Sequence, residues 1–227
     1  IRGRDHWLRT DPQAHSWQTV MSRVILVRHG QTTLNQQLRY SGQRDAPLTP
    51  LGEAQQERLR ACLAEERIDR VVCSDLEHMR GFAALVAADH HCGAEPYPAL
   101  REASFGAWEG LTYDEAMARD RRAMVAFNRD TVQVAPPGGE SLVALEARAS
   151  PCFAALIKEH KDRAGALLVV SHGGTLRALL CSLLRMPLER HWTLRVDSAS
   201  RTVIDMYRMG PIVETLNDTC HLHGLAQ

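Results

Sequence analysis

Two histidines that each follow a short hydrophobic run are the residues of this sequence best suited to chemistry. His29 follows the run 24–27 and comes directly after Arg28, and His172 follows a second run at 166–170. A cation and an imidazole at the end of a strand suit an anionic ligand. A single histidine in such a place can equally be a solvated loop residue. The functional interpretation therefore depends on the fact that the pattern occurs twice, at His29 and at His172.

Buried strands are the elements that must position these histidines. Both runs are short and rich in β-branched residues and leucine, which predicts strands of a parallel sheet. If the two strands are neighbours, His29 and His172 meet in the crevice at their carboxyl ends. The residues after Gly173 have a helical pattern, and the start of that helix directs free N–H groups at a bound anion. Phosphate fits such a site.

The rest of the chain alternates strands with helices. Further strands are predicted at 69–73, 202–207 and 212–216, and the last two form a hairpin. Thr49 and the pair Ser74-Asp75 are predicted to cap helices. The pattern predicts an α/β fold: a three-layer α/β/α sandwich with a mainly parallel sheet and an antiparallel edge near the C-terminus.

Composition bounds the domain organisation and the kinds of partner. The 227 residues are 44% hydrophobic and 24% charged, which suits one domain at 21–227, and residues 1–20 are interpreted as an extension or a cloning remnant. Lys plus Arg and Asp plus Glu number 27 each, so charge gives no case for nucleic acid or an anionic membrane. Six cysteines without a C-x-x-C pair, and no long apolar run, predict a soluble cytoplasmic protein.

Seven segments, in order, resemble those of the histidine phosphatase superfamily, which includes the cofactor-dependent phosphoglycerate mutases. The segments are V-R-H-G-Q-T-T-L-N at 27–35, G-Q-R-D-A-P-L-T-P-L-G at 42–52, C-S-D-L at 73–76, L-R-E-A-S-F-G-A-W-E-G-L at 100–111, P-G-G-E-S at 137–141, V-S-H-G-G at 170–174 and L-N-D-T-C-H-L at 216–222. The resemblance covers nearly the whole chain from Met21 onward.

The resemblance implies a role for particular residues. His29 is the expected nucleophile, which forms a phosphohistidine, and Glu102 is the expected acid for the leaving oxygen. His172 is also expected to take part in catalysis. The residues expected to hold the phosphate are Arg28, Asn35, His78, His172 and Gly173. No metal and no cofactor is expected.

Each of these residues also has a plain structural interpretation. Arg28 and Glu102 could form an ion pair, His172 could fill a loop, and Asn35 could be a turn residue or a cap. Glu109 is expected to be structural or to lie at the rim of the site.

One position departs from the pattern of the family. Two residues beyond the leucine of S-D-L the family has a phosphate-binding arginine, and here the residue is His78. Arg80 cannot replace it, because residues i and i+2 face apart on a helix. We therefore predict weakened phosphatase activity that is shifted toward acid pH. A phosphate-binding or regulatory protein that has lost catalysis is the alternative.

Within the family, the sequence favours a phosphatase over a mutase. The segment between Gly110 and Pro136 is short and lacks the basic motifs expected of a mutase, which must keep water from its phosphohistidine. The predicted substrate is a small phosphomonoester, and both its identity and the oligomeric state stay open. The cluster at 89–92 (D-H-H-C) is interpreted as the end of a helix and not as a metal site.

Overall fold

The computed structural model describes residues 20–225, so the interpretation of residues 1–20 lies outside this range except at Val20. Helices and strands alternate along the described chain, as the sequence pattern predicts. The strands are β1 (Ser22–Arg28), β2 (Ile68–Cys73), β3 (Ala94–Pro96), β4 (Ala166–Ser171), β5 (Arg201–Tyr207) and β6 (Gly210–Asp218), and the helices are α1 (Thr33–Gln36), α2 (Pro50–Leu63), α3 (Glu77–Asp89), α4 (Tyr113–Arg119), α5 (Arg121–Arg129), α6 (Leu142–His160) and α7 (Gly173–Leu183).

One sheet in the order β3-β2-β4-β1-β5-β6 runs through the described chain. The strands β3, β2, β4 and β1 are parallel to one another, whereas β5 is antiparallel to both β1 and β6. The prediction of a mainly parallel sheet with an antiparallel C-terminal edge is therefore confirmed. The two strands that carry the histidines are direct neighbours, with Arg28 opposite Ser171.

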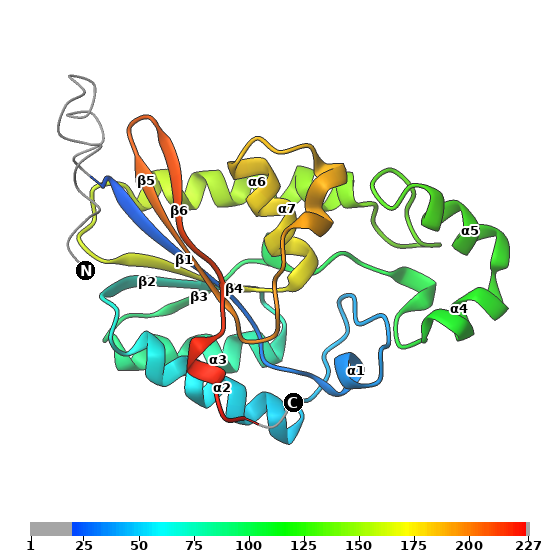
Figure 1. Ribbon diagram of the computed structural model, residues 1–227, viewed down its shortest axis with the longest axis horizontal. Coiled ribbons are helices and arrows are strands. Elements are labelled where there is room, and N and C mark those ends of the chain that lie inside the picture. The colour runs from blue at the N-terminus through cyan, green and yellow to red at the C-terminus, as the bar shows by residue number, and fades with distance from the viewer. Residues whose placement is uncertain (1–19, 226–227) are drawn as a thin grey trace.

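The sheet is covered by helices on both faces (Figure 1). Val24 and Leu26 of β1 belong to a hydrophobic cluster shared with α6 and α7. Ile25 and Val27 point to the opposite face and pack in a second cluster with α2 and α3. Because successive residues of a strand face opposite sides, this alternation produces the predicted three layers.

The two predicted helix caps have different outcomes. The side chain of Thr49 accepts a hydrogen bond from the Gly52 amide and Pro50 begins α2, so that prediction is confirmed. The prediction that Ser74 and Asp75 cap the next helix is wrong, because α3 begins at Glu77 without a side-chain cap. The Ser74 hydroxyl instead contacts His172, and Asp75 accepts hydrogen bonds from Arg101.

The segment between β3 and α6 carries a third hydrophobic cluster. Its helices α4 and α5 lie beyond the end of the sheet (Figure 1). Trp108 is buried there against Ala116 and Met124, in a cluster distinct from the two clusters on the sheet. Leu100 and Val132 of the same segment belong to the cluster shared with α6 and α7, so the segment also packs on the main core.

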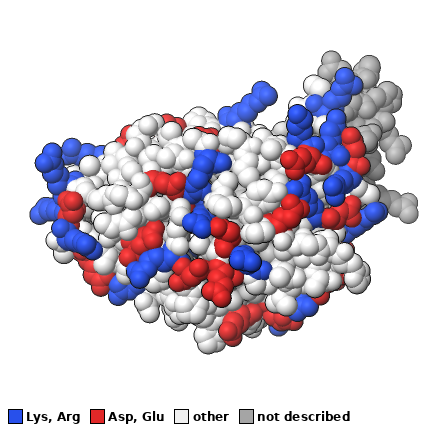
Figure 2. Space-filling view, turned by 180° about the vertical axis from the view of Figure 1, so that it is seen from behind, with Lys and Arg blue, Asp and Glu red and all other residues white. Residues whose placement is uncertain are grey.

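Charged side chains of both signs lie next to one another on the face seen in Figure 2. No helix of the described residues has both the length and the apolar character needed to cross a bilayer.

Candidate active site

His29 and His172 lie together at the carboxyl edge of the sheet. Because Arg28 is paired with Ser171, the next residue of each strand leaves the sheet at the same level. The centroids of the two imidazole rings are 5.3 Å apart. The sequence prediction that these histidines converge is confirmed.

The His29 ring is fixed in one tautomer by its own loop. Its Nδ1 lies 2.7 Å from the Gly30 carbonyl oxygen, which can only accept, so Nδ1 carries the proton and Nε2 keeps a lone pair. Burial, with further contributions from nearby Arg28 and His78, holds the pKa of His29 well below its ordinary value of 6.5. The imidazole is thus neutral at neutral pH, which is the nucleophilic form.

His172 is anchored by a strand that the sequence did not link to it. Its Nε2 lies 3.0 Å from the Ser74 hydroxyl, directly after β2, and its backbone is the N-cap of α7. Burial is the main reason that the pKa of His172 also lies well below the ordinary range. The ring is therefore a second neutral imidazole beside His29, and its role in catalysis stays a prediction.

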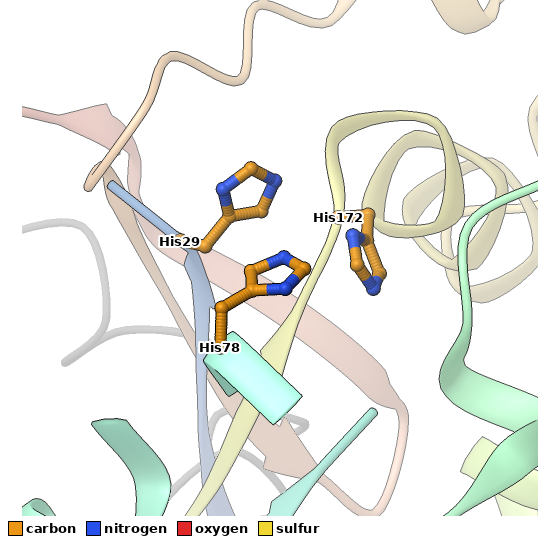
Figure 3. A group of neighbouring side chains, drawn as sticks. All are labelled: His29, His78 and His172. Carbon is orange, nitrogen blue, oxygen red and sulfur yellow. The ribbon is translucent and has the colours of Figure 1, made fainter. Parts of the chain in front are cut away.

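His78 completes a group of three rings (Figure 3). Its ring centroid is 5.3 Å from that of His29 and 5.9 Å from that of His172, and its Nδ1 is 2.9 Å from Asp45 Oδ1. Arg80, by contrast, is exposed and lines a different surface cavity that contains none of the three histidines. The structure thus agrees that Arg80 does not replace the missing arginine.

Arg28 presents a free donor to the site. Its Nη1 donates to the Val196 carbonyl at 2.8 Å, but its Nε is buried and has no hydrogen-bond acceptor within residues 20–225. A side chain at Gly173 would lie 3.4 Å from this Nε. Among the described residues Arg28 forms no ion pair with Glu102, so the plain ion-pair interpretation does not hold. A buried, unused N–H beside the start of a helix suits an anion.

The Glu102 carboxylate lies against the first turn of α7. It accepts hydrogen bonds from the amides of Gly174 at 2.8 Å and Thr175 at 3.0 Å. Behind it, Arg148 donates to the Glu102 carbonyl at 2.9 Å and pairs with Glu140. The carboxyl is therefore held at the helix start that follows His172.

Asn35 has the capping role that the sequence left open. Its Oδ1 accepts from the amide and the hydroxyl of Thr32 at 3.1 and 2.9 Å, and the Thr32 hydroxyl accepts from the Asn35 amide. These bonds form a capping box at the start of α1. The expected contact of Asn35 with phosphate stays a prediction.

A cleft of about 470 Å³ extends from the site, and we call it the aromatic cleft. Arg28, Glu102 and Gly173 are among the residues that line it. Trp192 lines it as well and is 68% exposed, with the Arg177 guanidinium 4.9 Å from its ring centroid. The other aromatic side chains of the cleft are Tyr40, Phe105, Tyr113 and Phe127.

Sequence reasoning missed the side chains that hold the histidines and the carboxyl in place. Asp45 and Ser74 lie in segments that resemble the family, and this resemblance could have pointed to them as residues near the site. No pattern pointed to Arg148 or Trp192, because their contacts are made across the fold. Glu109, expected to be structural, accepts from the amides of residues 43 and 105.

The cluster at 89–92 (D-H-H-C) lies at the end of α3, as the sequence interpretation has it. Asp89 forms an ion pair with Arg60. Within residues 20–225, this cluster is not among the groups whose ligand atoms come close enough together to hold an ion.

Residues 24–219 match the family profile of the histidine phosphatase superfamily, branch 1. The chain therefore belongs to this superfamily, and it is a phosphatase of that group. It is 34% identical to the adenosylcobalamin/alpha-ribazole phosphatase of Escherichia coli strain K12, over 86% of this chain and 95% of that protein.

Two solved structures are similar to this fold. One is the alpha-ribazole phosphatase from Shigella flexneri, with a TM-score of 0.80 and 33% identity over 86% of this chain and 96% of the other. The other is a mycobacterial glucosyl-3-phosphoglycerate phosphatase in complex with VO3, with a TM-score of 0.76 and 29% identity over 87% of this chain and 100% of the other.

Proposed function

We propose that the protein hydrolyses small phosphomonoesters through a phosphohistidine at His29. The observation that carries this proposal is the bond from His29 Nδ1 to the Gly30 carbonyl, which leaves the Nε2 lone pair for attack on phosphorus. The second imidazole, the unused Arg28 donor and the start of α7 surround the same position. Together they supply a nucleophile and a set of groups for the phosphate oxygens.

The reaction divides into two displacements. In the first, His29 Nε2 forms a bond to phosphorus as the P–O bond to the leaving group breaks, and Glu102 protonates the departing oxygen. In the second, Glu102 takes a proton from water, the water oxygen attacks phosphorus and the P–N bond breaks. Arg28, His172 and the Gly173 amide bind the phosphoryl oxygens, on which charge is concentrated.

His78 weakens this activity in our proposal. Its Nδ1 is taken by Asp45, so the ring has one nitrogen left and donates from it only when protonated. An arginine offers a permanent charge and several donors. The alternative to be tested is a protein that has lost catalysis and only binds phosphate.

The experiment that tests hydrolysis compares two products of one substrate. With 3-phosphoglycerate, the proposal predicts free phosphate and no 2-phosphoglycerate, whereas a mutase produces 2-phosphoglycerate. His29→Gln should abolish phosphate release from any accepted ester, with circular dichroism as the control for folding. Binding of phosphate without turnover on a panel of esters contradicts the proposal and favours a binding protein.

The aromatic cleft favours a phosphoester whose leaving group carries an aromatic ring. Arg28 and Gly173 line the cleft together with the exposed Trp192. An aromatic ring that stacks there contributes about 0.5–1.5 kcal/mol beyond its burial. Alpha-ribazole phosphate, named for the E. coli relative, is of this type.

A substrate comparison tests the role of the cleft. Alpha-ribazole phosphate should have a higher kcat/KM than ribose 5-phosphate. Trp192→Ala should reduce that preference, whereas the matched surface variant Leu85→Ala on α3 should leave it unchanged. An equal kcat/KM for both substrates contradicts this assignment.

We also propose that residues 21–227 form a single domain and that the protein works in the cytoplasm. The support for the location is the six cysteines, which are free thiols in the described chain.

A further inference from the structure

The three imidazoles form a group suited to a ligand other than phosphate. His29, His78 and His172 can each offer a ring nitrogen such that all three nitrogens lie within 4.8 Å of one another. The rings come from three separate elements and face a common space (Figure 3). Within the described residues no other set of histidine, cysteine and carboxylate side chains meets this criterion. The proposed hydrolysis uses the imidazoles in separate roles and does not require three ring nitrogens around one point.

Each ring is anchored through one nitrogen and leaves the other free. His29 Nδ1 is held by the Gly30 carbonyl at 2.7 Å and His78 Nδ1 by the Asp45 carboxylate at 2.9 Å. His172 is held through Nε2 by the Ser74 hydroxyl at 3.0 Å. Metal-binding histidines are commonly fixed in this way, because the outer hydrogen bond sets the tautomer and directs the remaining lone pair at the ion.

We propose that His29, His78 and His172 form a three-imidazole site that binds one Zn²⁺ ion. Imidazole nitrogen is a preferred zinc ligand, and three such ligands with a fourth open position are a common tetrahedral arrangement. Zinc–nitrogen bonds of about 2.0–2.1 Å bring ligand nitrogens to about 3.3 Å of one another, so the three rings have to move closer together when the ion binds.

His78 is the residue that creates this site. An arginine at the same position has no lone pair to offer, and two imidazoles alone form an incomplete site. Asp45 favours a cation here, since its carboxylate lies directly behind the His78 ring. Arg28 opposes a cation, so an anion at the open position would strengthen metal binding.

If the proposed function holds, the protein cannot bind zinc at this site and turn over a phosphoester at the same time. The ion takes the lone pair of His29 Nε2 that would otherwise form the bond to phosphorus. The protein should therefore be an active phosphatase when free of metal and should be inhibited by zinc.

The test is zinc binding by the metal-free full-length chain, measured by equilibrium dialysis and by competition with a chromophoric chelator. The wild type should bind one more Zn²⁺ per chain than His78→Gln or His78→Arg. Asp45→Asn should weaken binding about 10- to 100-fold. The matched control His91→Asn, on the exposed turn after α3, should bind like the wild type.

Cobalt provides a readout that does not depend on activity. Co²⁺ in the wild type should give the visible absorption bands of a tetrahedral site, and these bands should be absent from His78→Gln. Equal zinc stoichiometry and equal affinity in the wild type and in both His78 variants overturn the proposal. A protein that binds zinc as described but never hydrolyses an ester when metal-free refutes the proposed function and leaves the zinc site standing.

Discussion

Replacing His78 by arginine should increase phosphatase activity. In the wild type, Asp45 accepts from His78 Nδ1, so the neutral ring has no second N–H to give to a phosphate oxygen. The ring contributes a donor at Nε2 only when it is protonated. An arginine can keep the hydrogen bond to the Asp45 carboxylate through one nitrogen and donate to phosphate through the others.

The size of the effect follows from one added charge-assisted hydrogen bond. Such a bond is worth about 1.5–3 kcal/mol, which corresponds to about a 10- to 100-fold increase in kcat/KM if it is realised in the transition state. The guanidinium of His78→Arg carries its charge across the whole pH range of the assay.

The assay is the initial rate of p-nitrophenyl phosphate hydrolysis between pH 5 and 9, with a chelator present to keep both proteins free of metal. Arg80→Gln is the matched control, since Arg80 is exposed in a different cavity and should not change the rate. A ratio of variant to wild type near one at every pH would refute the reasoning, because His78 would then lie outside the phosphate pocket.

Three further predictions concern the carboxyl, the helix start and the buried rings. Glu102→Gln should lower kcat about 100- to 10,000-fold and let phosphoenzyme accumulate with p-nitrophenyl phosphate, as measured by rapid quench. Gly174→Ala should lower kcat about 100-fold, because its Cβ would lie 2.5 Å from Glu102 Oε1. The control Gly81→Ala, with open space in α3, should keep kcat and add about 0.5–1 kcal/mol of stability in urea unfolding. Because the folded pKa values of His29 and His172 lie below the ordinary 6.5, the unfolded chain binds more protons in acid. The free energy of unfolding should therefore fall as pH drops below about 6.5, and a pH-independent value contradicts this.

Much of the fold was predictable because its signals are local. The hydrophobic runs of β1 and β4 are buried on both faces, and such continuous runs indicate central strands of a sheet. Thr49 followed by Pro50 is a local signal for a helix start, because threonine is a favoured N-cap and proline is favoured at the first helical position. The cap predicted at Ser74 failed because its side chain serves a histidine 98 positions away, and no local pattern carries that information.

The same distinction explains which parts of the site were found. His29 and His172 were predictable because each stands one residue past a strand, and parallel strands end at one edge. The bond from Asp45 to His78 and the bonds from Arg148 behind Glu102 depend on how loops close over that edge. The short-range bonds of Asn35 to Thr32 could be foreseen only as one of several interpretations of the residue.

The most direct test of the account is to trap the phosphoenzyme. The metal-free protein is mixed with a ³²P-labelled phosphomonoester, quenched within milliseconds, digested and sequenced by mass spectrometry. We predict one acid-labile, alkali-stable phosphohistidine at His29, formed at least as fast as phosphate is released and absent from His29→Gln. Phosphate release without label at His29, or label at another residue that keeps pace with turnover, would contradict the account.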